Sequence, residues 1–364
     1  MKRWWKWIVA AVVVLLVALG LAALLAATRR GSLGRAWIVP VGAAVVALVC
    51  LRADGPTAVW RHSGIGAGRV ALPQGGPNAI QDWVNAKRRQ VLWQAEGVEA
   101  SVALVAIDGL SFYVNGKSDG NATGDAGTQI MLGVLPALLH PEPKAAMVVG
   151  LGTGETPGWL AEVPGIEQVD VVELEPAVDE MARCCAPVNH HVLDHPKVRR
   201  IYNDAREVLL TAPDCYDIIA SEPSNPYRAG IANLFTREFY LAARARLRAQ
   251  GLFVQWVQGY EIDEATVRTA LATLRSVFDH VEVWQSKPED MLLVCSCRPL
   301  RYSPATLRRR IAEEPFRSAL AFGWRAADLE GMLSRFVAGP ALVDRIAADE
   351  VGRASCRERV SECV

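Results

Sequence analysis

The sequence predicts an α/β protein with a doubly wound, mostly parallel sheet, a small β-element before it and a transmembrane segment at the N-terminus. In residues 128–300 short apolar strands alternate with helices, as they do where helices cover both faces of parallel strands. A hairpin pattern precedes this region. Residues 7–27 carry no charge, and about 20 apolar residues are needed for a helix to cross a bilayer.

The composition argues against two classes of protein. The chain has 364 residues with 39 basic and 39 acidic side chains, so no excess of positive charge indicates nucleic-acid binding. Its eight cysteines are too few for a disulfide framework in a chain of this length, and the spacing of Cys184 and Cys185 does not suit tetrahedral zinc. We therefore expect no nucleic-acid partner and no metal.

Residues 1–52 are predicted to hold one or two transmembrane helices. Basic residues flank the run 7–27, and tryptophans precede it like an interfacial aromatic belt. A second uncharged run, 36–51, is shorter and contains Pro40. The alternative is a signal peptide, although its apolar core is usually only about 7 to 15 residues long. Because two crossings return the chain to its starting side, we expect attachment to the lipid of the inner cell membrane with the folded domain facing the cytoplasm.

The remaining segments are predicted from local patterns. Residues 53–92 are a Gly- and Pro-rich linker with a short amphipathic helix. Residues 93–127 form a small β-hairpin element with a turn at Asp108-Gly109 and end in a Gly/Asp-rich loop, 116–127. Residues 301–350 are a helical C-terminal extension. Residues 351–364 are interpreted as a non-native tail that resembles a translated sequencing adapter, the alternative being a solvated basic tail.

The main domain, 128–300, begins with a helix over 128–139. Its first four strands are predicted at 146–150, 169–174, 198–203 and 216–221, each followed by a helix or a turn. A helix from Thr236 to Gln250 leads to a strand, LFVQWV, and after another helix two strands, HVEVWQ and DMLLVCSC, form an antiparallel edge.

Polar and glycine residues follow the first three strands of this domain. Gly150, Gly152 and Gly154 form a turn between a strand and a helix, where backbone can approach a ligand closely. Glu173 ends the next strand, where a carboxylate can accept both hydroxyls of a ribose; the alternative is a tight turn with a surface charge. Asp204 ends the third strand and either accepts a hydrogen bond from an exocyclic amine such as that of adenine or caps the following helix.

The fourth strand leads into SEPSNP, residues 221–226, and the role of Glu222 in this segment is a separate question. A strand end in an α/β sheet is where chemistry usually occurs, so Glu222 either acts there or merely caps a turn.

Taken in order, five motifs resemble one family: PEPKAAMVVGLGTG, VDVVELEP, YNDAREVLL, YDIIASEPSNP and LFTREFY. From about residue 93 to 298 the chain is similar to the spermidine synthase family of polyamine aminopropyltransferases, within the AdoMet-dependent transferases. The apolar run before it is similar to bacterial members fused to transmembrane helices. The resemblance implies a Rossmann-like AdoMet-transferase fold and transfer of an aminopropyl group from decarboxylated AdoMet to a small amine or polyamine. It leaves a homodimer open.

The resemblance also implies roles for individual residues. Glu222 would accept the proton of the attacking amine, and Glu173 would hold the ribose. The residues expected around the nucleoside are Gly150, Gly152, Thr153, Gly154, Glu173, Asp204 and Ala205. The residues expected around the acceptor are Asp125, Gln129, Asn225, Tyr227 and Gln255.

The chain departs from the family pattern at several of these positions. Glu222 and Asn225 stand where the family has two aspartates, and Thr153 stands where an aspartate usually holds the aminopropyl ammonium. These changes remove counter-charges for a polycation. Asp119 and Asp125 would restore part of that charge if the loop 116–127 folded over the site, whereas Lys117 and Arg228 would oppose a polycation or meet a carboxylate.

Two other functions remain open. The Thr153 form of the glycine turn is common in methyltransferases, so the donor is alternatively AdoMet itself and the acceptor unknown. The domain is otherwise a non-catalytic nucleoside-binding part of a membrane protein.

Overall fold

The computed structural model describes residues 41, 42, 45, 62, 70, 73–107, 109–213, 215–224 and 230–348. The chain divides into two units, Met1–Ala58 and Val59–Val364, and every element described below belongs to the second. The predicted membrane runs 7–27 and 36–51 lie outside the described residues apart from three positions, and so does the predicted tail 351–364. Among the helices that are described, none has both the length and the apolar character to cross a bilayer.

The second unit begins with helix α4, Pro77–Gln90, and a small antiparallel sheet in the order β1-β2-β3-β4. The predicted hairpin is confirmed, with β2 paired to β3, but the sheet has two further strands. Its strands are β1 Val91–Glu96, β2 Ser101–Ala106, β3 Leu110–Val114 and β4 Lys117–Asn121.

The prediction of a loop over 116–127 was wrong for β4. Its residues have weak strand propensity, and pairing with β3 decides their conformation. Gly120 is needed there because a Cβ atom would lie 2.4 Å from Cε1 of the Phe112 ring.

The main sheet has eight strands in the order β12-β10-β11-β9-β8-β5-β6-β7. Strands β5 to β9 pair in parallel, and β10, β11 and β12 form an antiparallel edge, which confirms the predicted mostly parallel sheet. The strands are β5 Ala145–Val149, β6 Gln168–Glu173, β7 Val198–Tyr202, β8 Tyr216–Ser221, β9 Leu247–Gln258, β10 His280–Lys287, β11 Asp290–Ser296 and β12 Phe336–Ala338.

Two details of this sheet differ from the prediction. Helix α9 spans Arg237–Ala245 and ends before the predicted Gln250, because β9 already pairs with β8 at Leu247. Strand β12 lies in the segment predicted to be wholly helical, where it pairs with β10. In both places tertiary pairing overrides the local helical pattern.

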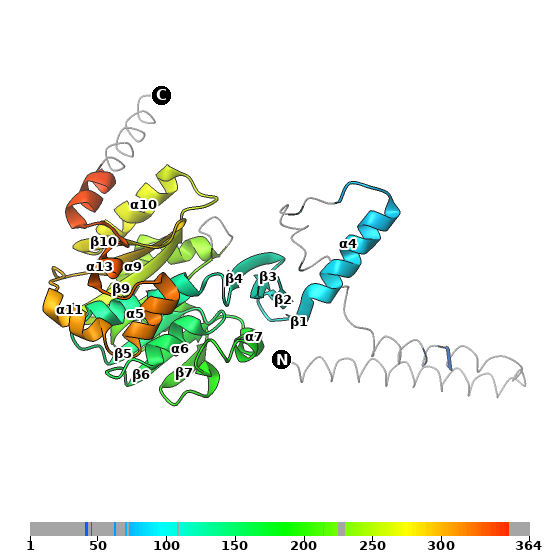
Figure 1. The fold of residues 1–364 in the computed structure, drawn as a ribbon, viewed down its shortest axis with the longest axis horizontal. Helices are drawn as coiled ribbons and strands as arrows, with labels where there is room; N and C mark the ends of the chain where they lie inside the picture. Colours follow the sequence, from blue (N-terminus) through cyan, green and yellow to red (C-terminus); the bar gives the residue numbers. More distant parts are fainter. Residues whose placement is uncertain are drawn as a thin grey trace, which may run out of the picture. The chain divides into compact units, whose positions relative to one another are not determined.

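Helices cover both faces of the main sheet (Figure 1). Alternate strand residues face opposite ways, so Val148 joins one buried cluster and Met147 the other. One face carries α5, α6, α7, α11, α12 and α13, and the other carries α8, α9 and α10. The helices are α5 Ala126–Leu139, α6 Glu155–Ala161, α7 Val178–Cys184, α8 Ala205–Thr211, α10 Glu264–Arg275, α11 Pro304–Ile311, α12 Phe316–Ala319 and α13 Leu329–Leu333.

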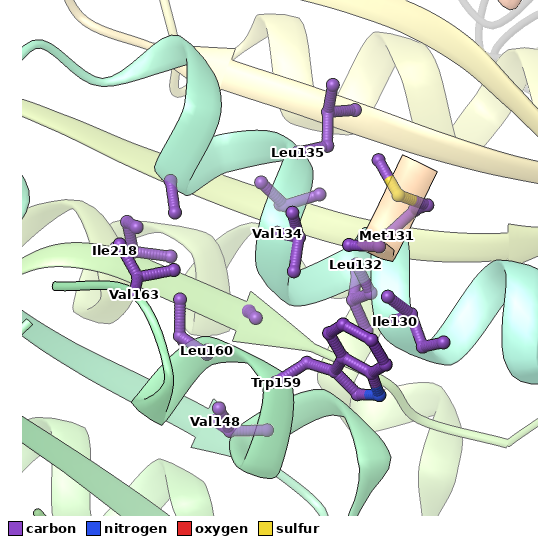
Figure 2. Close-up of a cluster of buried hydrophobic side chains, with 14 of the residues drawn as sticks. Ile130, Met131, Leu132, Val134, Leu135, Val148, Trp159, Leu160, Val163 and Ile218 are labelled. Atoms are coloured by element: carbon purple, nitrogen blue, oxygen red, sulfur yellow. The ribbon is translucent and has the colours of Figure 1, made fainter. Parts of the chain in front are cut away.

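Helix α5 is the central element of the first face. Every residue of the helix except Gly127 is buried, and all of the buried residues except Thr128 and Gln129 are apolar or glycine. Its side chains Ile130, Val134 and Leu135 pack with Trp159 and Leu160 of α6 in the cluster of Figure 2. The C-terminal helices bury its other side, so α5 is held as an inner layer.

The strand order reverses between β5 and β8. From β5 the chain proceeds through β6 and β7 on one side, and from β8 through β9 on the other. Ligands of open α/β sheets bind at such a switch point, beyond the carboxyl ends of the strands. The glycine turn follows β5 and Glu222 follows β8, so both lie at this position. The backbone N–H of Glu222 donates to the carbonyl of Val149, 3.2 Å away, which joins the two strand ends.

Candidate active site

The glycine turn connects β5 to α6 with a backbone that disfavours other residues. Gly150 and Gly154 have φ angles of 96° and 84°, in the left-handed region. A Cβ atom at Gly154 would also lie 2.6 Å from Cγ1 of Val192. Gly154 is the residue preceding helix α6, so the turn directs the helix N-terminus toward the switch point.

Glu173 holds this turn through its carboxylate. Oε2 accepts a hydrogen bond of 2.8 Å from the backbone N–H of Leu151, and Oε1 accepts one of 2.9 Å from that of Glu175. Burial raises the pKa of Glu173, although its backbone donors act against that shift. Each oxygen retains a lone pair for a ligand, so the assignment to a ribose remains a prediction.

The structure assigns Asp204 a capping role. Its side chain accepts a hydrogen bond of 2.9 Å from the backbone N–H of Arg206 and caps helix α8. Its hydrogen bonds with the Arg206 guanidinium lower the pKa of Asp204. Ala205 is buried at the start of α8. Capping was one of the two roles that the sequence left open, and adenine contact by Asp204 and Ala205 stays a prediction.

Glu222 lies next to the first turn of α6. The Thr156 hydroxyl lies 2.9 Å from Oε2 of Glu222 and 2.7 Å from the backbone carbonyl of Gln129. Burial raises the pKa of Glu222 to about 7, the nearby charges of Asp125 and Asp290 add to the rise, and the hydrogen bond from Thr156 opposes it. A carboxyl with this pKa is divided between its acid and base forms near neutrality, as a general base requires.

A cavity of about 400 Å³ lies against Glu222. The small sheet lines it through β4 and Tyr113, α5 contributes Thr128 and Gln129, and Trp256 and Tyr260 come from β9 and the segment after it. Four carboxylates line the same space, those of Asp119, Asp125, Glu222 and Asp290, and they outnumber the two ammonium groups there, of Lys87 and Lys117. Aromatic faces and carboxylates together suit an elongated cation with a hydrocarbon chain.

Two of these acids belong to the predicted Gly/Asp-rich segment, and both face the cavity. Asp119 lies 3.7 Å from the Lys117 ammonium and accepts a hydrogen bond of 2.9 Å from the Ser224 hydroxyl. It therefore ties β4 to the segment after β8. Asp125 accepts hydrogen bonds from the Asn121 backbone and the Lys287 ammonium, at 2.8 and 2.7 Å.

Asp290 was missed by the sequence reasoning. It begins strand β11, and its carboxylate accepts hydrogen bonds from the Thr128 hydroxyl at 2.9 Å and from Nε1 of Trp256 at 3.1 Å. Burial raises its pKa. No motif marks this position, because its place in the cavity depends on the β10–β11 hairpin reaching α5.

The other predicted acceptor residues have different surroundings. Gln129 lines the cavity, and the buried Thr153 hydroxyl donates to its side-chain oxygen, so Thr153 supports Gln129. Gln255 is completely buried and does not line the cavity. Asn225 and Tyr227, together with Arg228, lie outside the described residues. Within the described ranges no three His, Cys, Asp or Glu side chains are grouped as metal ligands.

Glu155 is a buried acid beside this site. It is the first residue of α6, is 1% exposed, and neither carboxyl oxygen has a hydrogen-bond partner among the described residues. Burial raises its pKa to about 9, and the charges of Glu222 and Asp125 add to the rise. The carboxyl is therefore protonated in the folded protein at neutral pH.

Glu155→Gln is expected to change how stability depends on pH. Because the folded pKa lies above the unfolded one, the stability linked to this proton is complete below about pH 4.5 and is lost as the pH rises toward about 9. Between pH 5 and pH 8 the free energy of unfolding of the parent should fall by up to about 4 kcal/mol relative to that of the variant. Urea denaturation across this range measures the difference, and a difference that does not change with pH contradicts the assignment.

Comparison with known proteins finds similarity to one family over part of the chain. Residues 126–287 match the family model described as the spermine/spermidine synthase domain. The polyamine aminopropyltransferase of Streptococcus pneumoniae is 30% identical over 155 residues, which are 42% of this chain and 54% of that protein. That of Nitrosomonas europaea is 32% identical over 145 residues, 40% of this chain and 44% of that protein. The chain thus spans about half the length of the curated relatives it matches.

Solved structures agree with the fold. A spermidine synthase in complex with the transition state analogue AdoDATO superposes with a TM-score of 0.61 at 19% identity, over 71% of this chain and 88% of that one. The spermidine synthase of Thermotoga maritima gives a TM-score of 0.59 at 20% identity, with the same coverage. These structures cover a larger share of this chain, 71%, than the 42% covered by the match to the Streptococcus pneumoniae protein.

Proposed function

We propose that this chain, which carries a domain of the spermine/spermidine synthase family, transfers an aminopropyl group from decarboxylated AdoMet to an amine, with Glu222 as the proton acceptor. The observation that carries the proposal is the position of Glu222. Its carboxylate lies at the switch point, between the glycine turn and a cavity lined with carboxylates. The matches to polyamine aminopropyltransferases support it.

The reaction requires a neutral amine. An alkylamine has a pKa of about 10, so the acceptor arrives mostly as an ammonium ion and must lose a proton before it attacks. The amine nitrogen then forms a bond to the aminopropyl carbon next to the sulfonium, and the bond from that carbon to sulfur breaks. The released electron pair stays on sulfur, giving methylthioadenosine, and the proton passes to Glu222.

The acids that line the cavity compensate for the counter-charges that are missing at Thr153 and Asn225. Those residues lack the counter-charges that a polycation needs, but Asp119, Asp125 and Asp290 line the same space. The negative charge therefore comes from β4, from the residue before α5 and from β11 in place of the glycine turn, with Asp119 and Asp125 each paired to a lysine. A diamine or polyamine is accordingly the acceptor class that the site fits best.

The spent nucleoside distinguishes this function from the alternatives. The purified chain, given decarboxylated AdoMet and 1,4-diaminobutane, is expected to release methylthioadenosine, measured by mass spectrometry. Release of S-adenosylhomocysteine from AdoMet instead would identify a methyltransferase. Nucleoside binding without either product would leave a non-catalytic domain. The methyltransferase is the less supported reading, because the family match is to the aminopropyl-transferring enzymes.

Three further elements of the proposal concern the chain's surroundings. The run 7–27 anchors the chain in the inner cell membrane, the catalytic domain faces the cytoplasm where AdoMet is made, and the chain forms a homodimer. The length and basic flanks of the run support the anchor, and a second crossing by residues 36–51, which returns the chain to its starting side, supports the orientation. A C-terminal reporter fusion active only in the periplasm would contradict the orientation, and light scattering of the purified chain would give its oligomeric state.

A further inference from the structure

Two of the four carboxylates that line the cavity form an ion pair with a lysine, and two do not. Asp119 pairs with Lys117, and Asp125 pairs with Lys287 at 2.7 Å. Within the described part of the chain, neither Glu222 nor Asp290 forms an ion pair. Glu222 has a role in the proposed chemistry, but nothing in the reaction itself requires the second acid.

Asp290 is held in place by neutral donors, and the Lys287 ammonium, whose charge also acts on Asp290, forms its ion pair with Asp125. The residue is 5% exposed, and its two oxygens accept separate hydrogen bonds from Thr128 and Trp256. Both donors are neutral, so the carboxylate is oriented without being neutralised. Burying an unpaired charge is costly, and the cost falls when a ligand brings the opposite charge. The carboxylate lines the cavity, where a bound cation would contact it.

We propose that Asp290 binds the distal ammonium group of an acceptor diamine whose reacting nitrogen lies at Glu222. This inference rests on the proposed function and adds to it a residue that determines specificity. Asp290 and Glu222 both line the cavity of about 400 Å³, so the two acids face one space. A short chain with a cationic group at each end would neutralise both.

The aromatic residues of the cavity fit the rest of such a molecule. Tyr113, Trp256 and Tyr260 line it together with the acids. Trp256 donates its Nε1–H to Asp290, so its ring is held beside the proposed ammonium position. Aromatic faces bind both methylene groups and cations. A monoamine of the same length would fill the apolar part but would leave Asp290 without its partner.

The test compares Asp290→Asn with the parent chain on two acceptors of equal length, 1,4-diaminobutane and 1-aminobutane. Asparagine keeps the size of the side chain and removes its charge. Loss of a charged hydrogen bond predicts that kcat/KM for the diamine falls about 10- to 100-fold, mainly through KM. For the monoamine, which carries no second ammonium, kcat/KM should fall much less, so the ratio of the two values is the readout. Circular dichroism and thermal unfolding show whether the variant is folded.

Asp279→Asn is the matched control. Asp279 is an exposed acid outside the cavity, 3.9 Å from the Arg244 guanidinium, so its substitution should leave both acceptors unaffected. Asp290→Glu, which restores the charge, is expected to recover part of the preference for the diamine. A diamine preference that is the same in the parent and in Asp290→Asn would overturn the inference.

Calorimetry of 1,4-diaminobutane binding separates this inference from the proposed function. Binding that weakens in Asp290→Asn, from a parent that releases no methylthioadenosine, would support the distal site and reject aminopropyl transfer. Release of methylthioadenosine with diamine binding that is the same in the parent and in Asp290→Asn would support aminopropyl transfer and reject the distal site. A parent that neither binds the diamine nor releases the nucleoside would reject both.

Discussion

Glu222→Gln is expected to lower kcat about 100- to 10,000-fold, because the variant cannot accept the proton of the attacking amine. Glutamine retains the oxygen that accepts the hydrogen bond from the Thr156 hydroxyl, so the surrounding structure should persist. Binding of methylthioadenosine should remain within about twofold of the parent, since it needs no proton acceptor. Steady-state kinetics with decarboxylated AdoMet and 1,4-diaminobutane measure the loss.

The pH dependence gives the same residue a second test. Glu222 must be deprotonated to act, and its pKa of about 7 predicts that kcat/KM of the parent rises with pH and levels off above that value. Glu222→Gln should lack this acidic limb. Glu207→Gln, an exposed glutamate on α8, is the control and should behave like the parent. If Glu222→Gln kept the parent's kcat and the rise of kcat/KM with pH, Glu222 would not be the proton acceptor.

Glu173→Gln is expected to weaken binding of the nucleoside about 10- to 100-fold. The carboxylate accepts hydrogen bonds from two backbone N–H groups, of Leu151 and Glu175, one on each oxygen. A glutamine side chain has a single acceptor oxygen, so its amide group would face one of those donors and loosen the glycine turn. It would also lose the charge that the ribose hydroxyls are proposed to contact. Calorimetry with methylthioadenosine measures the effect.

Glu175→Gln is a matched control two residues further along the chain. The Glu175 carboxylate also accepts backbone hydrogen bonds, but from Glu99 and Ala177, so it fastens the β1–β2 turn and the start of α7. Its substitution should lower the free energy of unfolding by about 1 to 3 kcal/mol and leave nucleoside affinity unchanged. Equal losses of affinity in the two variants would mean that Glu173 acts only through stability.

The sequence by itself determined the sheet and the positions at its switch point. Strand-helix alternation is a local property of the chain, and carboxyl ends of parallel strands meet at one edge. The glycine turn, Glu173 and Glu222 follow β5, β6 and β8, so their neighbourhood was predictable from the order of motifs alone. The motifs also predicted the match to the family model.

Only the tertiary structure determined which residues line the cavity against Glu222. Asp290 enters it because β11 pairs with β9, and Asp119 enters it because β4 pairs with β3; neither pairing is encoded in the local pattern. Asp204 caps its helix through a hydrogen bond that the sequence offered only as one of two roles. The charge in a cavity depends on which segments, distant in the sequence, line it. Burial by those segments raises the pKa of Glu222. A local sequence pattern predicts where strands end. The acids that would neutralise the proposed cationic substrate are brought together only by tertiary packing.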